Sequence, residues 1–385
     1  MSSTASSVTL LEPEQLAQLE SLIDQGLFQQ AHTLAAVHGD YRHWRGPAAM
    51  VMASRLSAHL GAPRLGDILA YLGYRRYPDA AETRLRYARY LLARRGQFRA
   101  WSFLQQFGNW MPEPSALRAE WLSFSAYLFA LLRDFTRSAA CSEQAIALSP
   151  EDPWLLVERA YCLEQEDRFA EALGCCEQAL RLAPGLRSAI IQAAQLEWQL
   201  NREEQALARL RSGAQECESS GLCAQLVDLL IECGELNEAE HWLARSEAQS
   251  PLLEKGLRRW YAGRRCDIAS LRGAYSLACQ LALEAGGPFY TKVAEHLENP
   301  QGRRCLLPVS FVRQHHMTCA PATLTALSAF WGRPVTHLEV AEEICYDGTS
   351  YQAERAWAER NGWLVREFTA DWATSCALID RGLPF

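Results

Sequence analysis

Small, aromatic and proline positions recur along the middle of this chain at a constant interval. One copy, AYLFALLRDFTRSAACSEQAIALSP, begins at Ala126, and the next, AYCLEQEDRFAEALGCCEQALRLAP, begins at Ala160. Small residues fit where two helices cross closely, an aromatic side chain fills the space between them, and proline stops the second helix. The matching positions are Ala126 and Ala160, Phe135 and Phe169, Ala145 and Ala179, and Pro150 and Pro184. The pattern predicts stacked helical hairpins.

Further copies extend this pattern in both directions. A third copy places Ala194, Ala206 and Gly213 one further interval along the chain, without the terminal proline. Weaker copies are QGLFQQAHTLA from Gln25, RRGQFRAWSFL from Arg94, and CGELNEAEHWLARSEAQSP ending at Pro251. Neither helix of such a hairpin buries its apolar stripe alone, so neighbouring hairpins must stack.

The length of the interval and the alanine, aromatic and proline positions resemble the tetratricopeptide repeat over residues 11–298. The resemblance implies a mainly α fold, a tetratricopeptide-like α-solenoid, whose concave face binds an extended peptide or a partner helix. The repeat alanines are assigned packing alone, without chemistry. Residues 1–10 are expected to form a flexible N-terminal tail.

The pattern changes after residue 298, where Gly286, Gly287, Pro300 and Gly302 interrupt the helical repeat. From residue 301 onward we expect an extended piece at 306–312, an alternating strand at 363–368 and four helices. The helices are expected at 320–331, 338–344, 351–361 and 372–380. This mixed order predicts an α+β domain over residues 301–385.

Charge and composition favour an ordinary globular protein. The net charge of -7 provides no general attraction to nucleic acid or anionic lipid. The stretch from Arg75 to Arg99 nevertheless holds eight arginines interleaved with Tyr77, Tyr87, Tyr90 and Phe98. Three interpretations remain open for it: a solvated or structural helix face, a site for an acidic partner, and a nucleic-acid site. Nucleic acid is the least favoured of the three, because the negative net charge of the chain does not attract a polyanion.

The thirteen cysteines are scattered without paired spacing and are odd in number, which favours a reducing, cytoplasmic compartment over a disulfide framework. The N-terminus has no basic region followed by an apolar run, and no segment approaches about 18 uninterrupted apolar residues. We therefore expect neither a signal peptide nor a membrane span. No cofactor motif is found, and the sequence does not indicate an oligomeric state.

Candidate chemistry lies in the segment QHHMTCAPATLTALSAFWG, from Gln314 to Gly332. Cys319 directly precedes a helix whose second position is proline, so its sulfur is expected near unpaired amide donors and the positive end of the helix dipole. Such a position favours the thiolate. Gln314, on the preceding loop, is placed to stabilise an oxyanion when the thiolate attacks a carbonyl. Cys319 as a small buried apolar residue is the alternative.

This segment resembles the C39 family of papain-like cysteine peptidases. The matching features are Gln314, four residues, Cys319, Ala320 and Pro321, then the apolar helix to FWG, the GTS turn at Gly348 and the final RGLPF. The resemblance covers 306–385 and implies peptide-bond hydrolysis through a thioester, with Cys319 as nucleophile and Gln314 as oxyanion donor. Ala320 stands where the family usually has glycine, and Thr318 where it often has an acidic residue.

A cysteine peptidase also needs a histidine base and an Asp or Asn that orients it. No histidine follows His337, so we expect the chain to be the N-terminal part of a longer protein and catalytically incomplete as given. His315 and His316 are expected to flank the cleft rather than to reach the sulfur. A metal at His316 and Cys319 is not expected, because no C-x-x-C or H-x-x-x-H spacing accompanies them.

Two functions follow. In the first, the repeats recruit a peptide or protein and the C39-like domain, residues 301–385, cleaves it with Cys319. In the alternative, the chain is a non-enzymatic tetratricopeptide-like interaction scaffold whose C-terminal domain is a degenerate peptidase fold retained for binding.

Overall fold

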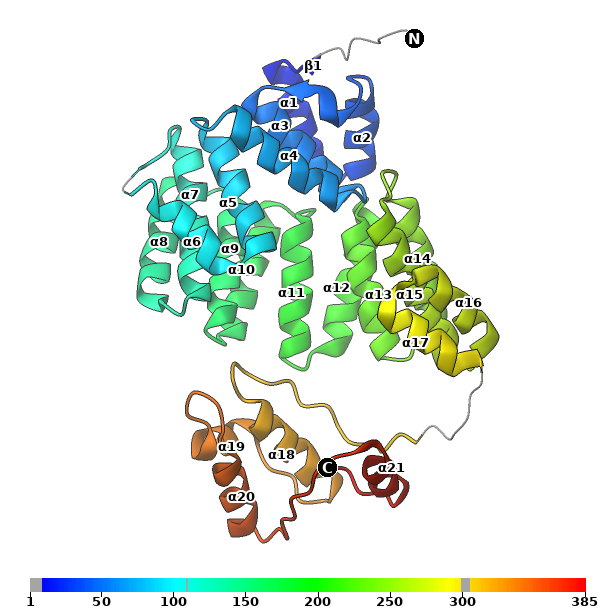
Figure 1. The fold of residues 1–385 in the computed structure, drawn as a ribbon. Helices are drawn as coiled ribbons and strands as arrows, with labels where there is room; N and C mark the ends of the chain where they lie inside the picture. The colour runs from blue at the N-terminus through cyan, green and yellow to red at the C-terminus, as the bar shows by residue number, and fades with distance from the viewer. Residues whose placement is uncertain (1–8, 109, 299–304) are drawn as a thin grey trace. The chain divides into compact units, whose positions relative to one another are not determined.

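The computed structural model describes residues 9–108, 110–298 and 305–385 of a chain that divides into two compact units. Unit 1 comprises residues 1–300 and unit 2 comprises residues 301–385. Paired helices build unit 1, and shorter helices joined by long irregular segments build unit 2 (Figure 1).

The helices of unit 1 follow one another as hairpins. They are, in chain order, α1 (Pro13–Asp24), α2 (Phe28–Ala36), α3 (Pro47–His59), α4 (Pro63–Arg76), α5 (Ala81–Arg95), α6 (Gln97–Gln105), α7 (Ser115–Leu131), α8 (Phe135–Leu148), α9 (Pro153–Gln165), α10 (Phe169–Leu182), α11 (Arg187–Gln199), α12 (Glu203–Glu216), α13 (Ser220–Glu232), α14 (Leu236–Ala248), α15 (Lys255–Leu271), α16 (Tyr275–Ala285) and α17 (Gly287–Glu298). Between α2 and α3, the 3-10 helix η1 (Tyr41–His43) leads into the short strand β2 (Trp44–Arg45), which pairs in parallel with β1 (Thr9–Leu10). Residues 1–8 of the expected N-terminal tail lie outside the described residues.

The strongest sequence repeats correspond to the hairpins α7–α8, α9–α10 and α11–α12. Their alanines are buried where the paired helices cross: Ala126, Ala160 and Ala194 on the first helices and Ala145 and Ala179 on the second. Gly213 lies where α12 meets α11, and a Cβ atom there would come within 2.8 Å of Ile190 Cγ2. The predicted stack of helical hairpins is confirmed.

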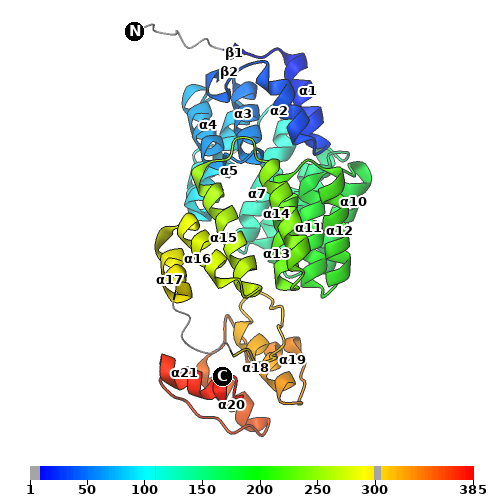
Figure 2. The same cartoon turned by 90° about the vertical axis from the view of Figure 1, so that its right-hand side faces the viewer.

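The first helices of the hairpins form one layer. Helices α3, α5, α7, α9, α11 and α13 each contact the next member of this series. The second helices contact chiefly their own partner and the following first helix, as α8 contacts α7 and α9. Figure 2 shows α11, α12 and α13 running side by side, as they also do in Figure 1. Because successive first helices pack more closely than successive second helices, the first helices make the inner layer of the stack.

The early hairpins return to contact the later ones at a place we call the seam. The Glu218 carboxylate, beyond α12, accepts hydrogen bonds from the backbone N–H groups of Gln29 and Gln30 in the first turn of α2, at 2.9 and 3.1 Å. Beyond α14, the Leu252 N–H donates to the Leu60 carbonyl at 2.9 Å. The seam therefore joins α2 and the residue after α3 to segments that follow α12 and α14, and it caps the otherwise unsatisfied amides of a helix start.

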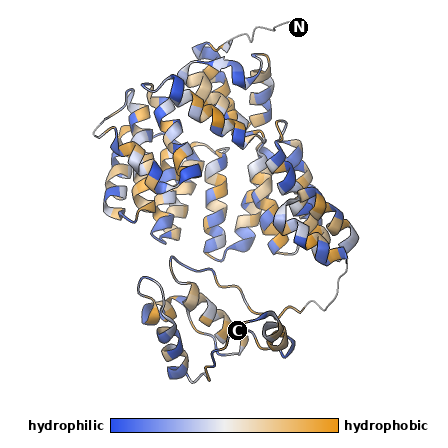
Figure 3. Cartoon of the chain, in the orientation of Figure 1, coloured by the Kyte–Doolittle hydropathy of each residue, from blue (hydrophilic) through white to orange (hydrophobic). Residues whose placement is uncertain are grey.

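Apolar side chains fill the spaces between successive hairpins of unit 1. The largest buried cluster joins α11 to α15 and includes Leu210, Leu222, Leu226 and Leu230, all fully buried. Figure 3 shows hydrophobic and hydrophilic residues alternating around these helices, as expected for helices that are covered on one side.

Unit 2 contains the helices α18 (Cys319–Phe330), α19 (His337–Ile344), α20 (Tyr351–Arg360) and α21 (Trp372–Asp380). Each begins and ends within one or two residues of its predicted bounds. Its largest apolar cluster is small and consists of Val340, Ile344, Trp357 and Ala358, with a few half-buried neighbours.

The α+β prediction for residues 301–385 is not supported. Within the described residues 305–385 there is no β-strand, so the strand expected at 363–368 is wrong. An alternating apolar pattern yields a strand only when a second strand accepts its hydrogen bonds, and no partner strand lies in this part of the described chain. The architecture shown is mainly α throughout, without a papain-like sheet.

Candidate functional site

Cys319 is the first residue of α18, one position earlier than expected. Thr318 precedes it as N-cap and makes no side-chain cap hydrogen bond, and Pro321 lies within the first turn. The Cys319 thiol is free and exposed. Cys319 is therefore not the buried apolar residue of the alternative interpretation, and it lies at the helix end where the dipole favours a thiolate.

Gln314 and Cys319 line the same pocket, a cavity of about 520 Å³. The remaining lining is mainly apolar and comes from the extended segment before α18, from α18 itself and from the C-terminal end of the chain. Leu306, Phe311, Ala322, Leu327 and Phe385 are examples. No histidine belongs to this lining, as far as the described residues define it. The structure thus brings together the two predicted site residues but supplies no base beside them.

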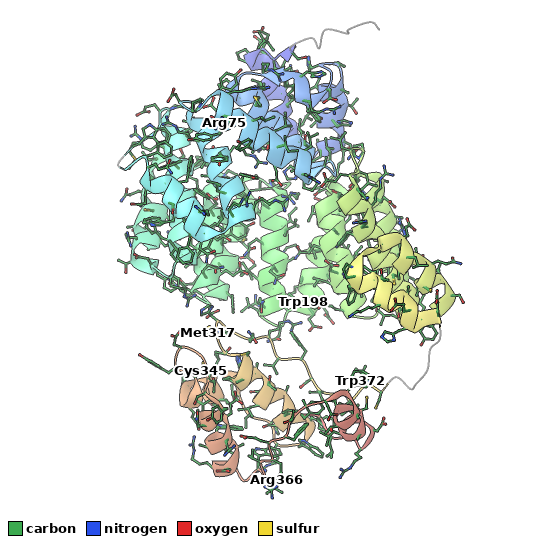
Figure 4. All side chains as sticks on the ribbon, in the orientation of Figure 1. Arg75, Trp198, Met317, Cys345, Arg366 and Trp372 are labelled. Carbon is green, nitrogen blue, oxygen red and sulfur yellow. The ribbon has the colours of Figure 1, made fainter. Side chains whose placement is uncertain are left out.

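The loop before Cys319 is held by α19 and by the segment that follows it. His337 Nε2 lies 2.9 Å from Thr318 Oγ1, which also donates to the His315 carbonyl at 3.0 Å. Met317 has a positive φ of 62°, and its carbonyl accepts a hydrogen bond from the Cys345 thiol (Figure 4). These contacts constrain the backbone that positions Cys319.

His337 was not predicted as part of this site. Its ring centroid lies 5.8 Å from that of His315, and burial, followed by the charge of His315, lowers the pKa of His337. The spacing between Cys319 and His337 gives no sequence signal, because only the packing of α19 against α18 brings the histidine to the loop. His315 and His316 were expected to flank the cleft, and neither belongs to the pocket lining among the described residues. Among the described residues, no group of three or more His, Cys, Asp and Glu side chains is arranged to hold a metal ion.

Seven of the eight arginines from Arg75 to Arg99 fall into two groups, and the eighth, Arg86, donates a hydrogen bond to the Ser54 hydroxyl. Arg84, Arg89 and Arg94 pair with Asp79, Glu158 and Asp67. Arg75, Arg76, Arg95 and Arg99 are exposed. The tyrosines between them pack on one another, as the rings of Tyr74 and Tyr87 stack at 4.5 Å. The paired arginines and the stacked tyrosines therefore stabilise the fold, because their charges and rings already have partners.

Ionisable side chains on five successive first helices form a group that we call the inner belt. Its members are Arg55 and His59 on α3, Arg86 and Arg89 on α5, Glu120 and Tyr127 on α7, Glu158 and Tyr161 on α9, and Arg187 on α11. They interact from helix to helix: Arg55 with Arg86, Arg89 with Glu120 and Glu158, and Arg187 with Tyr161 and, across the seam, with His59. The inner belt is thus continuous around the inner layer.

The Arg89–Glu158 pair is the most buried part of the inner belt. Only 1% of the Glu158 side chain is exposed, against 23% for Arg89. The Arg89 guanidinium also lies over the Phe124 ring, 5.2 Å from its centroid. Burial raises the pKa of Glu120 next to this pair, although the Arg89 charge opposes the shift. The sequence contained one signal of the inner belt: Glu158 stands one repeat after Phe124, so a charge replaces an apolar residue at one repeat position.

No helix in the described residues combines the length and apolarity needed to cross a bilayer. All thirteen cysteines are free.

Comparisons with known proteins give limited information. No protein-family model and no curated protein matches the chain. Among solved structures, the chain is similar to that of PilF from Pseudomonas aeruginosa, with 15% identity, a TM-score of 0.40, and coverage of 57% of this chain and 98% of that one. It is similar to a tetratricopeptide repeat protein from Parabacteroides merdae, with 12% identity, a TM-score of 0.39, and coverage of 69% and 97%. For the Rap protein in complex with Competence and Sporulation Factor, identity is 12%, the TM-score is 0.43 and coverage is 74% and 95%. At such low identities and TM-scores, the tetratricopeptide-like assignment rests on the constant repeat interval and the packing of the hairpins.

Proposed function

We propose that unit 1 is a binding scaffold for a peptide or a protein segment. The observation that supports this proposal is the inner belt. A helical stack needs only apolar and small residues between its hairpins, and burial of ionisable groups opposes folding unless they are paired or used. Nine such groups on one layer are therefore better explained by binding than by packing.

The inner belt offers what an extended peptide requires. A peptide presents backbone N–H and C=O groups that need hydrogen-bond partners when they leave water. The belt provides guanidinium donors, carboxylate acceptors and the hydroxyl groups of Tyr127 and Tyr161 on neighbouring helices. Arg89 Nη2 and Glu158 Oε2 have no hydrogen-bond partner within the described residues, so bonding capacity remains there.

A peptide array probed with the purified chain tests this proposal. Bound peptides are then resynthesised with a fluorophore and titrated by anisotropy with three proteins: the wild type, Cys319→Ala, and the double variant Tyr127→Phe with Tyr161→Phe. We expect the double variant to weaken binding about three- to tenfold, because two hydroxyl groups are lost while the rings remain. Cys319→Ala is expected to bind like the wild type. Tyr346→Phe, at an exposed position of unit 2, is the matched control. Peptide binding that depends on Cys319 and not on the belt tyrosines would contradict the proposal.

A second candidate function, cysteine-dependent peptide hydrolysis, is favoured by one observation. Gln314 and the exposed Cys319 line one pocket at the start of α18. In this hypothesis the Cys319 thiolate attacks a peptide carbonyl carbon, the Gln314 amide donates to the oxyanion, and the amine leaves with a proton to give a thioester. The proton must come from a group outside the pocket lining described above.

Thiol reactivity tests this second candidate. Folded protein is treated with a limiting amount of iodoacetamide, and labelling of Cys319, Cys305, Cys345 and Cys376 is followed by peptide mass spectrometry. Cys319 is expected to react at least about tenfold faster than the other three if the helix start stabilises its thiolate. Cys305, also exposed but outside a helix, is the matched control. Equal and slow labelling of all four would remove the argument for a nucleophile.

A further inference from the structure

The inner belt is not uniform, because two of its arginines, Arg86 and Arg187, form no ion pair within the described residues, and both lie near His59. Arg55 pairs with Glu20 at 3.1 Å, and Arg89 pairs with Glu158. Arg86 instead donates to the Ser54 hydroxyl at 2.8 Å, and no carboxylate within the described residues forms an ion pair with Arg86 or Arg187. His59 has three arginines as its charged neighbours: Arg187, Arg55 and Arg86. The charge of Asp67 favours the charged form of Arg86 but is outweighed by burial and by the charges of Arg55 and Arg89, so positive charge is only partly compensated here.

The seam brings two of these residues, His59 and Arg187, together from distant parts of the chain, and Arg86 reaches α3 through Ser54. His59 is the last residue of α3, its ring packs on Phe28 at 4.4 Å, and its carbonyl accepts a hydrogen bond from Ser220 Oγ at 3.3 Å. Arg187 begins α11, and its Nη1 lies so close to Gly221 that a Cβ atom there would be 3.0 Å away. The His59 backbone and the Arg187 side chain thus both lie at the start of α13, from opposite sides of the seam.

These three side chains are partly enclosed by protein and still open to water. His59, Arg86 and Arg187 are all half-buried. Burial, followed by the charges of Arg55 and Arg89, lowers the pKa of Arg86 to about 10, and burial also lowers the pKa of Arg187. The helix dipole adds to this unfavourable situation, because Arg187 is a cation in the first turn of α11 and the N-cap Leu186 provides no side-chain acceptor. A bound anion would relieve all three effects at once.

We propose that His59, Arg86 and Arg187 form an anion subsite within the inner belt, which takes a carboxylate of a bound acidic peptide. The inference rests on the proposed function of unit 1 and names the chemistry of its ligand. Two forked guanidinium groups match the two oxygens of a carboxylate.

The other charges of the inner belt decide between a peptide and a polyanion. Glu120 and Glu158 lie farther along the same layer, on α7 and α9. A nucleic acid carries a negative charge on every nucleotide and would place phosphates beside these carboxylates. A peptide with a single acidic position places its carboxylate at His59, Arg86 and Arg187 and neutral or basic residues along the rest of the belt.

Paired peptides test the subsite. Each peptide selected on the array is synthesised in two forms, with Glu or Gln at its acidic position, and both forms are titrated by fluorescence anisotropy at about 0.15 M salt. The wild type is expected to bind the Glu form at least tenfold more tightly. That preference should fall below threefold in Arg86→Gln with Arg187→Gln, and it should persist in Arg75→Gln with Arg76→Gln, a matched pair of exposed arginines.

Each outcome leads to a decision. Peptide binding without a preference for the Glu form in the wild type overturns the subsite and leaves the scaffold function standing. No peptide binding at all overturns the scaffold function. Binding of a labelled single-stranded oligonucleotide, lost in the Arg86 and Arg187 double variant, overturns the assignment to peptides.

The melting temperature of each variant shows whether a loss of binding comes from loss of folding. If like charges repel at the subsite, Arg86→Gln alone should melt at or above the wild-type temperature, because the lost charge has no acidic partner. Arg89→Gln should melt lower, because it leaves buried Glu158 unpaired. A fall with Arg86→Gln as large as that with Arg89→Gln would make Arg86 structural and overturn its role in the subsite. The wild-type preference for the Glu form is measured independently of any variant.

Discussion

Unit 1 and unit 2 bury their apolar side chains to very different extents. In unit 1 each hairpin is covered by the next, so Leu196, Leu210 and Leu226 are fully buried. In unit 2, Tyr346 is 96% exposed and Trp372 is 85% exposed. The difference arises from repetition: a stack supplies every helix with a neighbour of matching shape, whereas the helices of unit 2 have 8 to 12 residues and share one small cluster. Within α21, which is described throughout, no residue is buried.

The largest effect is expected from breaking the buried ion pair of unit 1. Glu158→Ala leaves the Arg89 charge without its partner in a mostly enclosed place and should destabilise unit 1 by about 3–5 kcal/mol. Urea unfolding followed by tryptophan fluorescence measures the loss. Arg94→Gln is the matched control, because its exposed pair with Asp67 should contribute less than about 1 kcal/mol. If both variants unfold at the same urea concentration, the inner belt does not depend on this pair.

The next effect compares the two units directly. Leu210→Ala removes a fully buried side chain from the largest cluster of unit 1 and should cost about 2–5 kcal/mol, through lost burial and the cavity left behind. Leu364→Ala, at a position of unit 2 that is 80% exposed, should change stability by less than about 0.5 kcal/mol. Thermal unfolding of both variants measures the contrast. Similar losses would show that Leu364 is covered in solution and would remove the distinction between the units.

The smallest effect concerns pH. Burial, followed by the charges of Arg187, Arg55 and Arg86, holds the pKa of His59 well below 6.5 in the folded state. The unfolded chain therefore binds more protons at this group, so stability is lost as the pH falls below about 6.5, by up to about 1.4 kcal/mol per pH unit. His59→Gln should flatten the dependence of unit 1 stability on pH between about 7 and 5.5.

His337→Gln in unit 2 serves as the comparison for this measurement. The pKa of His337 is also lowered, by burial and then by the charge of His315, whereas three arginines act on His59. We expect a weaker effect of pH at this position. A pH profile that does not change with His59→Gln would mean that the folded and unfolded chains bind protons equally at His59, as expected if a counter-ion offsets the arginine charges.

The sequence predicted the parts of this protein that depend on neighbours along the chain. The alanines at 126, 160 and 194 and the prolines at 150 and 184 determine where helices cross and stop, so the hairpins followed from spacing alone. The helices of unit 2 were also predicted within two residues, because caps and breakers such as Ser350 and Gly332 act locally. Gln314 and Cys319 were predicted to meet, and they line one pocket.

Other features depended on contacts between distant residues. The alternating segment at 363–368 has no partner strand among the described residues. The presence or absence of a partner strand cannot be predicted from the pattern of the segment itself. His337 reaches the Cys319 loop only through the packing of α19, and the inner belt becomes continuous only because His59 meets Arg187 across the seam.

The sequence by itself thus determined a stack of helical hairpins followed by a segment of different character with a cysteine at a helix start. Only the tertiary structure decided that the early hairpins return to the later ones, that Arg86 and Arg187 lie near His59 without an ion pair among the described residues, and that residues 305–385 contain helices without a sheet. The physical reason is the range of the interactions. Helix propensity, capping and hairpin packing act over one repeat, whereas charge clusters, seams and strand pairing depend on residues that the folded chain alone brings together.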